Sequence, residues 1–212
     1  KARIEKLTEI KNAKSLDGFL ITSLPSVKYL SGYYFYFEHG ISPFQLLPAA
    51  LFIDAALNAT IVLADNETQQ SALIDPAISI KTYETYVYEK PLDHATQFLL
   101  QLHDAFKQGG INKGKVGVEL NTLPASIVLS LRTHYPGIEL VDITEEITRL
   151  RIIKDADEIE LIRQAAALSD IGQSAVLNLA KGGMSELELF NLVRRQIEAS
   201  VNTRVPLMAD FV

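Results

Sequence analysis

The spacing of hydrophobic residues along the chain changes repeatedly between two periods, and each change marks the boundary of an expected element. Short apolar runs, typical of β-strands, occupy residues 19–22, 49–54, 60–64, 78–83, 115–120 and 138–142. Apolar residues at intervals of three or four, which predict amphipathic helices, occupy residues 4–15, 66–73, 94–107 and 124–134. Because strands alternate with helices, we expect an α/β fold in which helices cover an open sheet.

Two of these strands are close together in the chain. Residues 49–54 and 60–64 are joined by residues 55–59, in which Asn58 is suited to a turn. We expect an antiparallel hairpin, which makes the sheet mixed and not wholly parallel. A short helical turn over residues 23–31 ends at Gly32, where a left-handed conformation costs glycine little.

The pattern becomes purely helical beyond residue 147. Asp155 followed by Glu158 is close to a capping box, and the apolar residues after it predict a long amphipathic helix over residues 156–179. Arg149, Arg151 and Lys154 precede this helix, where the helix dipole does not favour cations. These residues are either a solvated basic linker or partners for carboxylates across a domain boundary.

The change of pattern predicts a domain over residues 1–145, a linker over residues 146–155 and a second domain that begins at residue 156. In the second domain, Ser185 and Glu188 form another capping box at the start of a helix, and residues 205–212 resemble a strand. Two helices and one strand do not close a hydrophobic core, so we expect residues 156–212 to be the truncated start of a domain.

Composition excludes several classes of protein. The net charge is −6, the pI is about 5.3 and no long basic stripe is present, so the electrostatic footprint of a nucleic-acid-binding protein is missing. The absence of cysteine excludes disulfides and thiolate metal sites and fits a reducing cytoplasm. No apolar run approaches the roughly 20 residues of a membrane span, and the N-terminus does not resemble a signal peptide. We expect a cytoplasmic protein with no membrane or nucleic-acid partner.

Few residues are candidates for chemistry. His94 and His103 lie nine positions apart on one predicted helix, too far to share a metal, and His134 lies at a helix end. We interpret these three histidines as structural. HExxH, CxxC, GxSxG and P-loop patterns are absent, so no catalytic residue and no metal ligand is assigned within the chain.

An aromatic segment is the exception. Seven aromatic residues lie between Tyr29 and Phe44, too many to be left exposed. They either pack in a core and a dimer contact, or form a pocket toward which residues 36–39 project. In the second case Phe37 could stack on a planar or cyclic substrate, and His39 titrates near neutral pH.

Four motifs, in order along the chain, resemble the N-terminal domain of the creatinase/prolidase/aminopeptidase P family. They are Asp17-Gly18-Phe19-Leu20-Ile21-Thr22 with Pro25-Ser26-Val27-Lys28-Tyr29-Leu30-Ser31-Gly32, then Val116-Gly117-Val118-Glu119, then Leu140-Val141-Asp142-Ile143, and Leu150-Arg151-Ile152-Ile153-Lys154 with Asp157-Glu158-Ile159. Ser26 departs from the asparagine that many Xaa-Pro peptidases have before the YLxG turn. The motifs extend over nearly the whole chain.

The resemblance implies that the N-terminal α/β domain is joined to a catalytic domain of the α+β pita-bread fold, of which this chain would hold the first helices and strand. In the peptidase members, two aspartates, one histidine and two glutamates of that domain bind two divalent metal ions of the manganese, cobalt or zinc class. None of these ligands maps onto residues 1–212, so the chain alone is expected to be inactive.

The resemblance also implies a homodimer in which the N-terminal domain reaches over the partner's active site. If a gap of one residue is allowed, Phe37 and His39 fall near the substrate-binding positions of creatinase-like members. These two residues are the predicted substrate-binding residues of the chain.

Three functions are compatible with this resemblance. The first is a C–N bond hydrolase that acts on small peptides, an Xaa-Pro peptidase of the prolidase or aminopeptidase P kind. The second is a creatinase-like, metal-free hydrolase of a small amidine or cyclic amide. The third is a non-catalytic module of the same fold that binds peptides or proteins. The acidic ligands downstream of the chain would discriminate between them.

Overall fold

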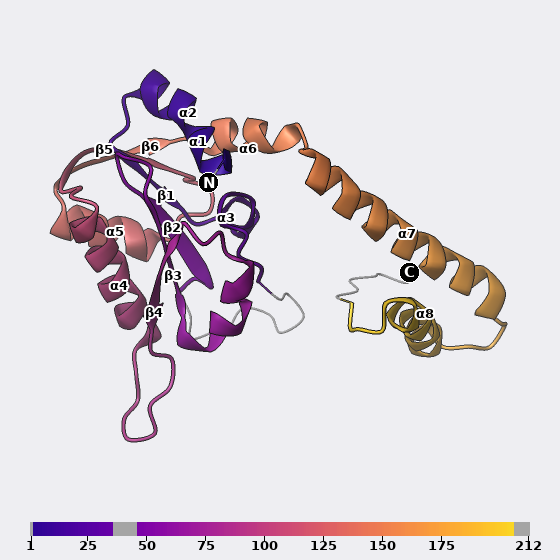
Figure 1. Cartoon of the computed structure of the whole chain (residues 1–212). Helices are drawn as coiled ribbons and strands as arrows, with labels where there is room; N and C mark the ends of the chain where they lie inside the picture. The colour runs from indigo at the N-terminus through magenta and orange to yellow at the C-terminus, as the bar shows by residue number, and fades with distance from the viewer. Residues whose placement is uncertain (1, 36–45, 206–212) are drawn as a thin grey trace. The chain divides into compact units, whose positions relative to one another are not determined.

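The structure is a computed structural model that describes residues 2–35 and 46–205 (Figure 1). The chain divides into two compact units, Lys1–Ile152 and Ile153–Val212. Phe37 and His39, the predicted substrate-binding residues, lie outside the described residues, as does most of the strand predicted at residues 205–212.

A six-stranded sheet forms the centre of the first unit, in the order β4-β3-β2-β1-β5-β6. Its strands are β1 (Gly18–Ile21), β2 (Ala49–Ile53), β3 (Ala59–Ala64), β4 (Ser79–Tyr83), β5 (Lys113–Val118) and β6 (Gly137–Asp142). β2 is antiparallel to both β1 and β3, and the other neighbouring pairs are parallel. The sheet is therefore mixed, and the antiparallel hairpin predicted from the sequence is confirmed.

Helices cover both faces of this sheet (Figure 1). One face is covered by α1 (Ala2–Glu5), α2 (Leu7–Lys14), α3 (Leu24–Ser31) and α6 (Thr144–Ile152). The other face is covered by α4 (His94–Gln108) and α5 (Ala125–His134). A 3-10 segment, η2 (Asp65–Leu73), follows β3. The open α/β sheet with flanking helices that the sequence predicted is thus confirmed.

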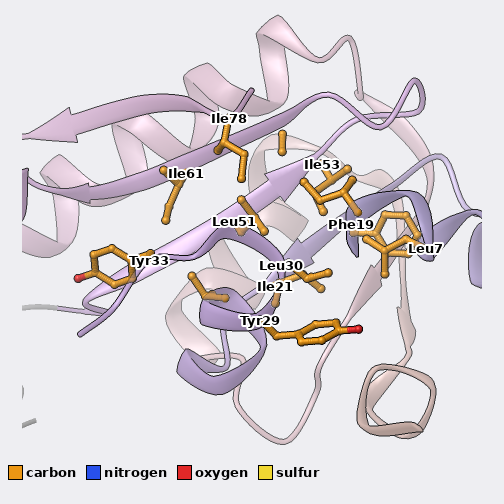
Figure 2. Close-up of a cluster of buried hydrophobic side chains, with 14 of the residues drawn as sticks. Leu7, Phe19, Ile21, Tyr29, Leu30, Tyr33, Leu51, Ile53, Ile61 and Ile78 are labelled. Carbon is orange, nitrogen blue, oxygen red and sulfur yellow. The ribbon is translucent and has the colours of Figure 1, made fainter. Parts of the chain in front are cut away.

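The two faces of the sheet bury separate hydrophobic cores. Phe19 and Ile21 of β1 belong to the core beneath α3, while Leu20 between them belongs to the core beneath α4 and α5. Figure 2 shows the first of these cores, in which Tyr29, Leu30 and Tyr33 pack against strand residues. Because side chains of a strand alternate between faces, burial on both faces explains why β1, β2 and β3 read as continuous apolar runs.

The turn between β2 and β3 is held by Asp54, the residue directly after β2. The Asp54 carboxylate oxygen Oδ1 accepts hydrogen bonds from the backbone N–H groups of Ala56 and Asn58, at 2.8 and 2.9 Å. Leu57 takes the left-handed conformation, with φ of 66°. The turn predicted around Asn58 is present, but Asp54 supplies the acceptor that shapes it.

The basic residues ahead of the long helix belong to a helix of their own. Arg149 and Arg151 lie in the last turn of α6, where the helix dipole favours cations, and Arg149 forms an ion pair with Glu145 one turn earlier. The dipole argument applied to Arg149 and Arg151 from the sequence was therefore wrong. The first unit continues to Ile152 because Ile147 of α6 is buried in its core, so α6 occupies most of the range predicted as a linker, residues 146–155.

Tyr29 joins α3 to α6 within the first unit. Its ring is 5% exposed, its hydroxyl donates to the carbonyl of Leu150 at 3.2 Å, and it accepts from Lys6 Nζ at 3.3 Å. The guanidinium of Arg3 lies 4.7 Å from the ring centroid, a cation–π distance. Three segments of the chain therefore meet on one buried tyrosine.

Over its described residues, up to 205, the second unit contains two helices, α7 (Ala156–Leu179) and α8 (Glu186–Val201), and both predicted capping boxes are present. Glu158 accepts from the Asp155 N–H at 2.9 Å, and Glu188 accepts from the Ser185 N–H at 2.8 Å. Its core of buried hydrophobic side chains is small and consists of Ala175, Val193 and Ile197.

None of the helices among residues 2–35 and 46–205 combines the length and the apolar character needed to cross a membrane.

Candidate functional site

The connections from β1 and β5 leave the sheet on opposite faces, which creates a topological switch point. β1 and β5 are neighbouring parallel strands, so their carboxyl ends lie at the same edge. β1 continues into α3, which packs on one face, and β5 continues toward α5, which packs on the other. In open α/β sheets this position is where ligands usually bind, so its polar residues are the first candidates for a functional site.

Glu119 follows β5 directly and is the buried carboxyl group of this edge. The residue is 4% exposed, and Ser26 Oγ donates to its Oε1 at 2.7 Å. The backbone N–H of Ser23, the residue before α3, lies 3.4 Å from Oε2. Burial raises the pKa of Glu119, and the hydrogen bonds from Ser26 and Ser23 and the nearby Arg151 oppose that rise. The carboxyl group is thus held at the N-terminal end of α3, where the helix dipole favours an anion.

Further polar contacts join the ends of the parallel strands. Thr22 and Thr122 are 3.3 Å apart between their hydroxyl oxygens, which connects the segments after β1 and β5. At the end of β6, Asp142 Oδ1 accepts from the Thr144 hydroxyl at 2.6 Å and from the Thr144 N–H at 3.0 Å. These hydrogen bonds lower the pKa of Asp142. The edge is therefore an ordered polar network.

The chemistry of this network suits positioning of the backbone. The Ser26 hydroxyl donates a hydrogen bond to a carboxyl group that is already engaged at a helix terminus. A serine nucleophile would instead need a base that takes its proton and is oriented by a third group. The arrangement fixes the N-terminal end of α3 to the end of β5. We therefore assign Glu119 and Ser26 a positioning role.

The C-terminal end of α3 leads into the aromatic segment. Gly32 has φ of 82°, and the Ser31 carbonyl accepts from the Asp75 N–H at 2.9 Å, so this end is tied to the segment after η2. Tyr33 and Phe35 are buried in the first core. Tyr34 between them is only partly buried, and Lys28 Nζ lies 4.6 Å from its ring centroid. The remaining residues of the segment, which include Phe37 and His39, lie outside the described residues.

The structure also brings together two histidines that the sequence placed apart. His103 of α4 and His134 of α5 have ring centroids 4.4 Å apart, whereas His94 lies at the start of α4. In the part of the chain that the structure describes, no group of three or more histidine or acidic residues could hold a metal ion. The described residues therefore do not fit the two-metal centre that the family resemblance implies for the peptidases.

Sequence reasoning did not assign a role to Glu119 or Ser26. Glu119 was noticed only as part of a motif, and Ser26 only as a departure from a family pattern. A polar residue directly after a buried parallel strand was the available signal, since such residues collect at the carboxyl edge of a sheet.

Comparisons with known proteins agree with this architecture. The sequence model of the creatinase/prolidase N-terminal domain matches residues 3–153. The uncharacterized peptidase YqhT of Bacillus subtilis is 24% identical over 189 residues, which are 89% of this chain and 46% of that protein. A creatinase from a Bacillus species is 30% identical over 92 residues, 43% of this chain and 22% of that protein.

Solved structures show the same fold at low sequence identity. The prolidase from Pyrococcus horikoshii has a TM-score of 0.68 at 20% identity, and the Xaa-Pro dipeptidase from Bacillus anthracis has a TM-score of 0.69 at 21% identity. Each match covers 94% of this chain and 49% of the other. The chain thus spans about half the length of the relatives that it matches over most of its own length.

Proposed function

The chain belongs to the creatinase/prolidase N-terminal domain family, and on that basis we propose that it is the N-terminal portion of a C–N bond hydrolase, an Xaa-Pro peptidase. The observation that carries the proposal is that matches to solved peptidase structures extend over nearly the whole chain. The solved structures that cover 94% of the chain are a prolidase and an Xaa-Pro dipeptidase. The substrates would be small peptides with proline after the scissile bond.

The proposed parent enzyme would use two divalent metal ions of the manganese, cobalt or zinc class, which supply a polarised carbonyl and an activated water. Their ligands would come from a pita-bread domain of which α7 and α8 are the first helices. The chain alone would then bind no catalytic metal and hydrolyse no peptide. Its own residues would dimerise and cover the active site.

Phe37 and His39 are the residues that we propose to contact substrate, across a homodimer. Tyr33 and Phe35 support this proposal because their burial fixes the start of the segment that carries them. Cytoplasmic location remains a prediction of the same proposal.

Two other functions remain as alternatives. The 30% identity to a creatinase over 92 residues favours the creatinase-like hydrolase, which would act without metal on a small amidine or cyclic amide. A non-catalytic peptide- or protein-binding module is the third possibility, because family membership does not by itself supply an activity.

We expect residues 1–212 to show no turnover of a Leu-Pro dipeptide with Mn²⁺, Co²⁺ or Zn²⁺, and the full reading frame to hydrolyse it in a metal-dependent manner. Proline release measures the reaction, and creatine is assayed in parallel. Metal-independent turnover of creatine alone by the full protein would replace the peptidase proposal with the creatinase-like one. Peptide binding without turnover would support the binding module. Hydrolysis by residues 1–212 would contradict the assignment of the catalytic residues to a later domain.

In the full protein, His39→Ala should lower kcat/KM about tenfold, an effect equivalent to about 1.4 kcal/mol of transition-state stabilisation. His94→Ala is the matched control, since His94 lies on α4, and it should leave kcat/KM within about twofold of wild type. Equal activities of the two variants would exclude a substrate role for His39 and leave the peptidase proposal intact.

A further inference from the structure

The contact between His103 and His134 joins α4 to α5 at the surface of the second core. The two rings are tilted by 46° to each other, and His103 Nε2 and the Ser130 hydroxyl oxygen are 2.9 Å apart. His134 Nδ1 lies 2.9 Å from the Ser130 carbonyl, to which a protonated Nδ1 donates. The Tyr135 hydroxyl donates to the His103 carbonyl at 3.1 Å. His103 of α4 therefore takes part in both of these polar contacts to the α5 segment, one with Ser130 and one with Tyr135.

The remaining ring nitrogen of His103 makes this contact sensitive to protonation. His103 Nδ1 is buried and has no hydrogen-bond partner among the residues that the structure describes. A protonated imidazole has an N–H on both nitrogens, so protonation would bury an unsatisfied charged donor. It would also place a positive charge on a ring whose centroid lies 4.4 Å from that of His134.

The charged groups around the pair do not compensate for this charge. Asp104, beside His103 on α4, is engaged by Lys81 of β4 and by Gln108, whose Nε2 donates to it at 3.0 Å. Lys107 of α4 lines the same surface hollow as His103, and its ammonium group has the same sign of charge as a protonated imidazole. Arg132 of α5 is two positions from both Ser130 and His134 and faces another side of that helix. The packed strands present apolar residues here, Val116 and Leu140 among them.

We propose that the His103–His134 contact is an acid-sensitive latch between α4 and α5, closed when the His103 imidazole is neutral and opened when it is protonated. The contact borders a hollow of about 460 Å³ lined by His103, Phe106 and Tyr135, among others, through which water reaches the charged ring once the helices part. Opening frees the C-terminal end of α5 and Tyr135, while the sheet beneath stays packed.

The direction of the pH dependence follows from the same geometry. Burial and the neighbouring His134 lower the pKa of His103 below its ordinary value. The unfolded chain therefore binds a proton at higher pH than the folded chain does, and stability is lost as pH falls through and below the ordinary histidine value of about 6.5. Carboxylates with lowered pKa values, such as Asp142, lose their contribution at lower pH. The raised pKa of Glu119 acts equally in wild type and in variants of His103, so a comparison between them from pH 7.5 to 5.5 isolates His103.

The test uses residues 1–212 and compares wild type with His103→Gln, which keeps a hydrogen-bonding side chain toward Ser130 but does not titrate. Between pH 7.5 and 5.5 the Tm of wild type should fall by about 2–4 °C more than that of His103→Gln. Hydrogen exchange of the amides at the C-terminal end of α5, corrected for intrinsic rates, should accelerate in wild type only. His94→Gln removes a histidine from the same helix but outside this contact, and it should behave as wild type.

Equal pH dependence of Tm and of exchange in wild type and His103→Gln would overturn the proposal. If His103→Gln does not fold, an NMR titration of the His103 ring in wild type decides the matter. A pKa equal to or above that of histidine in an unfolded peptide, or protonation without accelerated exchange in α5, would exclude the latch.

Discussion

Replacing Gly32 by alanine should lower the free energy of unfolding of the first unit by about 2–5 kcal/mol, the sum of a backbone and a steric cost. Gly32 has φ of 82°, a conformation that residues with a Cβ rarely adopt, and a Cβ built there would lie 2.3 Å from the carbonyl oxygen of Leu73. That carbonyl belongs to the backbone at the end of η2. The clash therefore forces α3 away from the segment that follows η2.

Gly110→Ala provides the matched control because only one of the two costs applies to it. Gly110 has φ of 71°, but no atom lies within 4 Å of the position of its Cβ. We expect Gly110→Ala to lose about 1–2 kcal/mol, the backbone cost alone. Urea unfolding followed by tyrosine fluorescence measures both variants, because all eight tyrosines lie in the first unit and tryptophan is absent. If both variants lose the same free energy of unfolding, the contact between a Cβ at position 32 and the Leu73 carbonyl adds no steric cost, and this prediction is wrong.

Removing the carboxyl group of Glu119 should have an effect of similar size. Glu119→Ala leaves the buried Ser26 hydroxyl and the Ser23 N–H without their acceptor and opens a cavity between α3 and β5. An unsatisfied buried polar group costs about 1–3 kcal/mol, so we expect a total loss of about 2–4 kcal/mol. Glu139→Ala, at an exposed position on the neighbouring strand β6, should change stability by less than about 0.5 kcal/mol. A loss for Glu119→Ala as small as that of Glu139→Ala would exclude the positioning role of Glu119.

Glu119→Gln separates the hydrogen bonds from the charge. The amide oxygen can still accept from Ser26, so the loss at pH 7 should be smaller than that of Glu119→Ala. Because burial raises the pKa of Glu119, the folded chain keeps this proton to higher pH than the unfolded chain does. Relative to Glu119→Gln, wild type should therefore gain stability as the pH is lowered from 7 toward the ordinary glutamate pKa. Urea unfolding of both proteins at each pH gives the difference in their free energies of unfolding, which should change in favour of wild type as the pH falls.

The arrangement of local elements was largely predictable because it depends on short-range patterns. The capping boxes at Asp155 and Ser185 formed as expected, since both partners lie within one helical turn. The hairpin of β2 and β3 also formed, although its turn uses Asp54. The prediction for Arg149 and Arg151 was wrong because the hydrophobic pattern did not reveal α6. Without that helix, two arginines in its last turn were taken for residues ahead of the N-terminus of α7.

The polar contacts of the first unit were not predictable because they join residues far apart in the chain. Ser26 and Glu119 are 93 positions apart, and they meet only because β1 and β5 are neighbours in the sheet. His103 and His134 meet because α4 and α5 cover the same face. Neither adjacency follows from spacing within a single element.

The sequence by itself determined the mixed α/β class, the family resemblance and the positions of most helices and strands, because hydrophobic periodicity, capping residues and ordered motifs are local. Only the tertiary structure decided which polar residues meet, because strand order sets the neighbours at the carboxyl edge and helix packing sets the neighbours on each face. The tertiary structure placed the Glu119 carboxyl group at the start of α3. It also brought His103 and His134 into contact, where the buried Nδ1 of His103 has no hydrogen-bond partner among the described residues.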